Sequence, residues 1–320
     1  MIKAGFVIPL MTVLLLFIFP LLLEASDQQR LGLTPILKFW DYGNPDVSEE
    51  RFRQLLQNSE NPHDKALIHT QIARTFSLRG EFSKANTSLA EAIKLIEEDQ
   101  SDEMALYLLE KGRTFNSSGD KESALTLFQR AWETARITGN DYIAVDAAHM
   151  AAIAANLEDQ MQWHMKALLL AEASESPEAG NWLGSLYNNI GWTYFNEEQY
   201  DKALSMFQKA VEFRRTRGDR EKLWIAKWMV ARTYRAMGRL DAALIIQQQL
   251  EKEQILAGLT PDAYVYEELA ELYFKKSDGR AGSYFELAYE ALSKDEWLVK
   301  NEPERVDRLR KMSREQVSPD

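Results

Sequence analysis

Small apolar residues recur along this chain at fixed intervals, and each set is accompanied by bulky apolar residues and followed by polar turns. The spacing is an Ala or Gly, an Ala twelve residues later and another Ala seven residues after that, as in Gly191, Ala203 and Ala210. Small residues at such positions let two antiparallel helices approach closely where they cross. The pattern therefore predicts pairs of helices that stack into a repeating array.

The first small residue of each copy marks one predicted helix pair. These residues are Ala73, Gly112, Ala148, Gly191, Ala231 and Ala270. All but one of them are followed three residues later by an aromatic residue, the exception being Ala151. Turns between paired helices are expected near Gly80, Gly119, Gly238 and Asp278. We therefore expect an all-α solenoid of about six helix pairs.

The cleanest copy, YNNIGWTYFNEEQYDKALSMFQKA, resembles the tetratricopeptide repeat. The residues that match the family pattern are Tyr187, Ile190, Gly191, Tyr194, Tyr200, Ala203, Phe207 and Ala210. The copies depart from the family in length, since they are 36 to 43 residues apart where the common repeat has about 34. The resemblance implies a right-handed superhelix whose first helices line a concave, protein-binding groove.

The amino terminus carries a long uncharged stretch. Residues 4–23 contain no charged side chain and are long enough to cross a bilayer as a helix. Lys3 precedes the stretch and Glu24 follows it, which places the rest of the chain on the far side of a membrane. We expect residues 1–25 to be a signal peptide or an uncleaved membrane anchor, with the repeats periplasmic, secreted or anchored outside the cytoplasm.

The remaining segments frame the array. Residues 26–63 are expected to form a connector and a lead-in helix, for which Ser48 is a candidate amino-terminal cap. Residues 64–292 hold the six repeats. Residues 293–320 are expected to supply a polar capping helix and a tail, because the last repeat of a solenoid needs a cover.

Composition excludes several classes of function. The net charge of −11 disfavours a nucleic-acid partner, and the absence of cysteine excludes disulfides, thiol catalysis and thiolate metal sites. The four histidines match no metal-ligand spacing, and no nucleophile or phosphate-loop motif is present. We therefore predict a non-enzymatic protein that needs neither metal nor cofactor and contacts a membrane only through its amino-terminal stretch.

The resemblance also implies which positions of the first helices face the groove, and the residues at these positions are mostly basic, amide or aromatic. They are Arg74, Arg113, Asn116, His149, Asn188, Trp192, Phe195, Trp228, Arg232 and Arg235. Arginine binds carboxylates through two parallel hydrogen bonds, and aromatic rings give flat apolar contacts. The predicted function is binding of an acidic, extended segment of a partner protein in this groove.

Three alternatives apply, one to these residues and two to the function. The arginines could instead pair within the chain, Arg113 with Glu110 and Arg232 with Glu267 or Glu271, while the tryptophans fill joints between repeats. The protein could also be a regulatory receptor that responds to a peptide or another ligand. A third reading is a structural subunit that holds a cell-envelope complex together.

Overall fold

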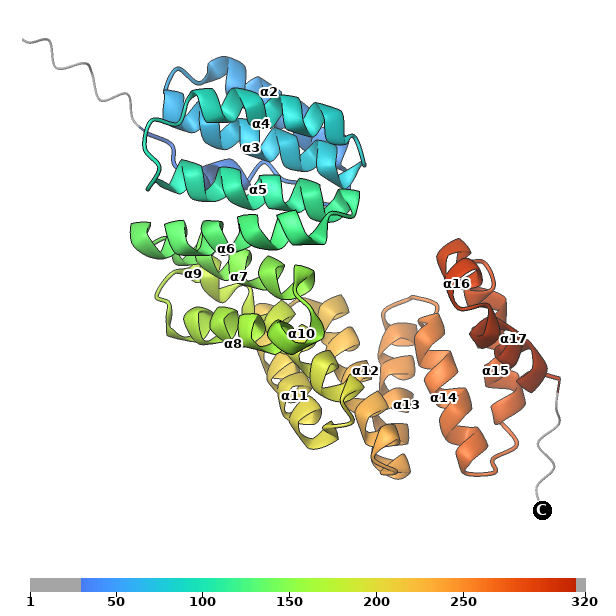
Figure 1. Ribbon diagram of the computed structural model, residues 1–320. Helices are drawn as coiled ribbons and strands as arrows, with labels where there is room; N and C mark the ends of the chain where they lie inside the picture. Colours follow the sequence, from blue (N-terminus) through green and yellow to red (C-terminus); the bar gives the residue numbers. More distant parts are fainter. Residues whose placement is uncertain (1–29, 315–320) are drawn as a thin grey trace, which may run out of the picture.

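The computed structural model describes residues 30–314, in which every regular element is a helix. The helices form antiparallel pairs that stack side by side into a curved array (Figure 1). The pairs are α3 (Pro62–Leu78) with α4 (Phe82–Lys94), α5 (Asp102–Ser118) with α6 (Lys121–Thr138), α7 (Asp141–Ala154) with α8 (Leu157–Ala173), α10 (Leu183–Asn196) with α11 (Tyr200–Arg217), α12 (Arg220–Ala236) with α13 (Leu240–Leu256), and α14 (Ala263–Lys275) with α15 (Ala281–Leu292). The predicted solenoid of six helix pairs is confirmed.

The small residues of the repeated pattern lie where paired helices cross. Ala73 and Ala203 are fully buried, and a Cβ added to Gly191 would lie only 2.4 Å from Cε1 of Phe207 in α11. The expected turns are also present: Gly80 and Gly119 have φ values of +74° and +97°, which glycine adopts more readily than other residues. Close crossing therefore explains why this spacing recurs.

Gly191→Leu is expected to lower the free energy of unfolding by about 1–3 kcal/mol, because the side chain would push Phe207 out of its place in the crossing. The midpoint of urea denaturation measures this loss. Gly180→Ala is the matched control, since a Cβ at Gly180 meets no atom within 4 Å. Equal midpoints for Gly191→Leu and the parent would contradict the proposed crossing.

The chain before the first pair packs on α3. Both α1 (Leu33–Leu37) and α2 (Pro45–Asn58) contact α3, and Phe52 of α2 is fully buried. The predicted cap is wrong: α2 begins at Pro45, and Ser48 lies inside the helix. The Ser48 hydroxyl instead accepts a hydrogen bond from the Asp41 amide, at 2.7 Å, and donates one to the Asp41 carbonyl.

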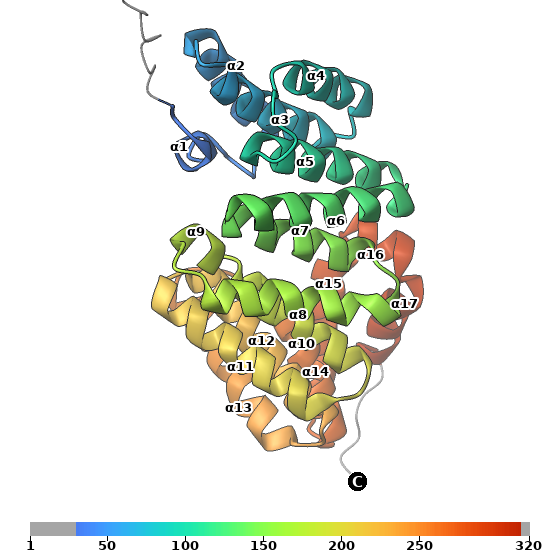
Figure 2. The same ribbon diagram turned by 60° about the vertical axis from the view of Figure 1, so that its left-hand side comes forward.

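Shorter helices complete the array. α9 (Pro177–Gly180) is an extra turn that packs on α7 at the edge of the molecule (Figure 2). After the last pair come α16 (Glu296–Asn301) and α17 (Pro303–Met312), and α17 packs on α15. Leu309 and Met312 of α17 are buried, so this helix adds to the core as well as presenting a charged surface.

None of the helices between residues 30 and 314 is both long and apolar enough to span a lipid bilayer. The uncharged stretch at residues 4–23, predicted to be a signal or an anchor, lies outside the described residues.

Candidate functional site

The predicted groove residues all lie on first helices of the pairs, namely α3, α5, α7, α10 and α12. Their surroundings differ along the array. Arginines at both ends of the set contact carboxylates of the chain itself, whereas the residues of α10 and the tryptophan of α12 form an aromatic patch between them.

The first helix of the array is covered by the chain's own amino-terminal segment. The guanidinium group of Arg74 lies 5.4 Å from the ring of Trp40 and 5.5 Å from the ring of Tyr42, two residues that stack on each other between α1 and α2. Trp40 also donates a hydrogen bond to Gln71 of α3. The guanidinium group of Arg74 therefore already contacts two aromatic rings of the same chain.

Arg113 is the centre of a buried ion network. Its guanidinium group contacts Asp146 of α7 and, at 2.5 Å, Glu110 of its own helix, and all three residues are buried. Burial lowers the pKa of Arg113, but the two carboxylates outweigh burial and raise the pKa above its ordinary value. The predicted alternative, pairing with Glu110, is confirmed. Nearby, the side-chain oxygen of Asn116 is buried without a hydrogen-bond partner among the described residues.

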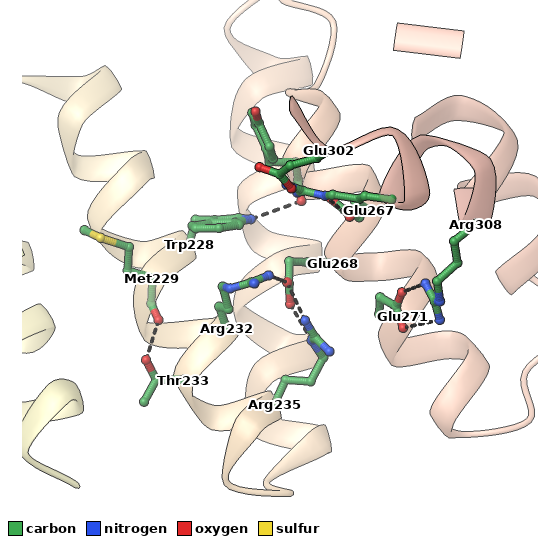
Figure 3. A network of polar contacts seen from close by, with 12 residues as sticks. Trp228, Met229, Arg232, Thr233, Arg235, Glu267, Glu268, Glu271, Glu302 and Arg308 are labelled. Carbon is green, nitrogen blue, oxygen red and sulfur yellow. Dashed lines mark hydrogen bonds and ion pairs between the residues drawn. The ribbon is translucent and has the colours of Figure 1, made fainter. Parts of the chain in front are cut away.

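Arg232 and Arg235 share one carboxylate of the next pair (Figure 3). Arg232 contacts Glu268 of α14 at 2.6 Å, and Arg235 contacts the same carboxylate at 2.7 Å. The sequence alternative named Glu267 or Glu271 as the partner of Arg232, and both are wrong. These two residues lie four apart on one face of α14, and there they contact Arg305 and Arg308 of α17.

Each of the four predicted arginines thus already contacts a carboxylate of the same chain. An acidic partner would have to displace that carboxylate, which is buried in the case of Glu110 and Glu268. Removing a buried carboxylate from its arginine costs energy that the incoming anion must repay. These arginines are consequently well placed to join successive helix pairs.

The predicted groove residues of α10 and α12 include an aromatic patch. The ring of Trp192 lies 5.1 Å from Phe195 and 6.3 Å from Trp228, in tilted or edge-to-face arrangements. The indole nitrogen of Trp228 donates a hydrogen bond to the Tyr264 carbonyl at 3.0 Å, which fixes the ring between α12 and α14. The rings are partly buried and leave apolar surface for a ligand.

Polar side chains adjoin this patch. The Asn188 amide donates a hydrogen bond to Asn189 at 2.9 Å. His149 is buried, with its ring 5.0 Å from Trp182 and 6.3 Å from His164. Burial lowers the pKa of His149, although the Asp146 carboxylate acts in the opposite direction, so the ring is neutral near pH 7.

Two pockets open on either side of Ile225, in the amino-terminal half of α12. One, called the polar pocket here because it is the more polar of the two, has a volume of about 370 Å³ and is lined by polar residues such as His149, Asn188, Arg214 and Lys222 and by apolar residues such as Met229. The other is largely apolar, with a volume of about 540 Å³, and its lining includes Trp224, Trp228, Leu259, Tyr264 and Val265. Ile225 lines both pockets and is 57% exposed.

Arg214 is the site residue that the sequence positions missed. It lies on α11, the second helix of its pair, and its guanidinium group rests on Gly184 of α10, where an added Cβ would lie 2.5 Å from Cζ. No carboxylate in the described part of the chain lies within ion-pair distance of it. Burial therefore lowers its pKa, with Asp219 acting weakly in the opposite direction. The sequence feature that could have indicated this contact is Gly184, a glycine within a helix that does not belong to the repeated pattern.

The chemistry of this site suits binding. It offers aromatic rings, amides and one guanidinium group without a carboxylate partner. No cluster of three or more acidic or histidine side chains between residues 30 and 314 could hold a metal ion.

Comparison with known proteins agrees with the fold. A family profile described as tetratricopeptide repeat matches residues 182–252, which run from α10 into α13. No curated protein sequence matches the chain significantly.

Solved structures, among them one with a tetratricopeptide-repeat sensor, are similar to most of the chain. A Signal Transduction ATPase with Numerous Domains, which carries a tetratricopeptide-repeat sensor and comes from Pyrococcus horikoshii, has a TM-score of 0.64 at 18% identity over 85% of this chain and 42% of its own. BtubC from P. vanneervenii has a TM-score of 0.54 at 18% identity, over 69% of this chain and 92% of its own. The Cut9–Hcn1 hetero-tetramer of the APC/C has a TM-score of 0.55 at 15% identity, over 88% of this chain and 51% of the matched chain.

The structural similarity shows a shared fold, a tetratricopeptide-type solenoid. The chain spans less than half the length of the Pyrococcus protein.

Proposed function

We propose that this protein is a non-enzymatic scaffold whose central groove, between α7 and α14, binds an extended segment of a partner protein. The observation that carries the proposal is the pair of pockets on either side of the exposed Ile225. The repeat profile covers α10 to most of α13, which lie between α7 and α14 in the chain. Tetratricopeptide repeats generally act as non-catalytic scaffolds, which agrees with a site built for contact.

The groove has the physical features that an extended peptide needs. Trp192, Phe195 and Trp228 supply partly exposed aromatic surface, whose burial gives most of the affinity at protein interfaces. Asn188 can exchange its bond to Asn189 for hydrogen bonds with a peptide main chain. Two pockets side by side can take two side chains of one segment.

Ile225 gives a direct test. The full-length protein and two variants would be used to purify binding proteins from the source cells. Ile225→Glu places a charge between the pockets, and Ile255→Glu is its matched control, because the two residues are 57% and 56% exposed and Ile255 lines neither pocket. We expect Ile225→Glu alone to lose the partner. Loss with Ile255→Glu alone would favour the structural-subunit reading instead.

A ligand-responsive receptor is the second candidate, and the division of the core favours it. The buried apolar residues form two clusters that meet at α12: Met229 and Val230 belong to the first, and Trp224 belongs to the second. The two parts are connected by Trp228 and Ile246, which pack against both clusters, and by polar contacts that include the one between Arg232 and Glu268. A ligand beside α12 could therefore change the angle between them. Small-angle scattering with a bound peptide tests this, and an unchanged radius of gyration contradicts it.

We also propose that the repeats lie outside the cytoplasm, on the evidence of the uncharged stretch at residues 4–23 with Lys3 before it and Glu24 after it. Alkaline phosphatase fused after Arg30 is expected to be active, because this reporter folds only after export. A cytoplasmic reporter fused at the same residue serves as the control. An inactive phosphatase beside an active cytoplasmic reporter would overturn the proposed location.

A further inference from the structure

Arg214 differs from the other partly buried arginines of the array. Arg113, Arg235 and Arg305 each contact a carboxylate, and these contacts raise their pKa values despite burial. Arg214 has no such contact among residues 30–314, and burial lowers its pKa. Its guanidinium group lines the polar pocket without an ion-pair partner, with the Phe213 ring 5.6 Å away and only the longer-range charge of Asp219 acting on it. A partly desolvated cation of this kind is stabilised by an anion that enters the pocket.

Arg214 is the group of the polar pocket best suited to bind an anion, because the other titratable groups there are paired or neutral. Lys222 contacts Asp219 at 2.8 Å, and Asp219 also accepts a hydrogen bond from the Lys222 main chain as the cap of α12. His149 is neutral. Asn188 and Ser185 add neutral polar groups to the lining. The pocket therefore has room and hydrogen-bond donors for a single carboxylate group.

The charges around the apolar pocket are of the opposite sign. Glu221 and Asp262 lie in its lining, together with the rings of Trp224 and Trp228. Asp262 caps α14 by accepting a hydrogen bond from the Tyr264 amide at 2.8 Å. Two carboxylates disfavour an acidic group here, whereas the aromatic walls favour a large apolar side chain. The two pockets therefore select different side chains.

We infer that the groove recognises a partner segment that presents a carboxylate side chain to Arg214 and a large apolar side chain to the pocket beside Trp224, on opposite sides of Ile225. This inference rests on the proposed function and narrows it. Arg214, and not the four arginines predicted from the sequence, is the residue that binds the carboxylate of the partner. Those four arginines already contact carboxylates of the chain itself. A single acidic residue beside an apolar one then replaces a generally acidic segment as the ligand.

A displayed library of random linear peptides, selected on the full-length protein, is the probe. Peptides are counted as groove ligands when Ile225→Glu abolishes their binding and Ile255→Glu does not. We expect these peptides to share an Asp or Glu near a Trp, Phe or Leu. Replacing the acidic residue by its amide is expected to weaken binding to the parent by about tenfold or more.

Two variants test Arg214 itself. Arg214→Gln removes the charge, and Gly184→Ala displaces the guanidinium group without changing any charge, because the new Cβ would lie 2.5 Å from Cζ. Both are expected to bind the acidic peptide and its amide counterpart about equally. Arg215→Gln is the matched control, since Arg215 is exposed, pairs with Glu212 and lies outside the polar pocket. Unfolding midpoints near that of the parent show that the variants are folded.

The outcomes separate the two proposals. Groove ligands without a shared acidic residue, or with an acidic residue whose effect persists in Arg214→Gln, overturn this inference and leave the proposed function in place. A library that yields no peptide dependent on Ile225 contradicts the proposed function, and this inference fails with it. Acidic peptides that discriminate Arg214→Gln from Arg215→Gln support both.

Discussion

Replacing Arg113 by Met is expected to lower the free energy of unfolding by about 3–5 kcal/mol, the usual cost of removing one partner from a buried ion pair. Met matches the apolar stem of arginine but leaves Asp146 without its cation and Glu110 with only Arg74, at 3.7 Å, and each of the two carboxylate residues is only 1% exposed. Two buried carboxylates then repel each other and lose hydrogen bonds. Urea denaturation near pH 7 measures the loss.

Two further variants separate the ion network from a general effect of losing an arginine. Arg215→Met removes a cation from an exposed pair with Glu212 and is expected to change stability by less than about 1 kcal/mol. Adding Glu110→Gln and Asp146→Asn to Arg113→Met removes the buried charges and is expected to recover much of the loss. If Arg113→Met proves no more harmful than Arg215→Met, the network does not stabilise the fold as we describe.

The helix pairs could be predicted from the sequence because a close crossing depends on side-chain size at fixed positions. Gly191 faces Phe207 across one crossing, and the same relation between Gly112 and Phe128 repeats in another pair. The extra helix α9 has no counterpart in the repeats, so the repeated spacing could not reveal it. The repeated spacing thus predicted the helix pairs but not the segments that connect one pair to the next.

The partners of the groove residues were harder to predict, because they depend on how neighbouring helices are rotated. One residue is 100° of turn on a helix, enough for Glu268 to face Arg232 while Glu267 faces Arg305. Arg214 reaches the groove from a second helix, which a rule about first helices excludes. The rings of Trp40 and Tyr42 come to Arg74 from a segment with no repeat pattern at all.

Acidification from about pH 6.5 to about pH 5 is expected to destabilise the fold, by up to about 2 kcal/mol, through His164. Burial, with a smaller effect of His149, lowers the pKa of His164 from its ordinary value of 6.5 to about 4. In the unfolded chain His164 binds a proton near pH 6.5, whereas in the folded protein it stays neutral. His164 therefore costs the folded state no stability above pH 6.5. As the pH falls below 6.5, the unfolded chain gains a proton that the folded protein does not bind, and the free energy of unfolding decreases.

His164→Gln is expected to flatten this dependence, because glutamine is polar and of similar size but does not titrate. His63→Gln controls for the loss of a histidine as such, since the His63 side chain is 45% exposed. The pH range also separates histidine from carboxylates: the pKa values of Glu49 and Glu253 lie below their ordinary value of 4.5, so those groups act at lower pH. A slope between pH 6.5 and pH 5 that is as steep in His164→Gln as in the parent would therefore exclude His164 as its cause, while a smaller remaining slope is expected from His149 and His69, whose pKa values burial also lowers.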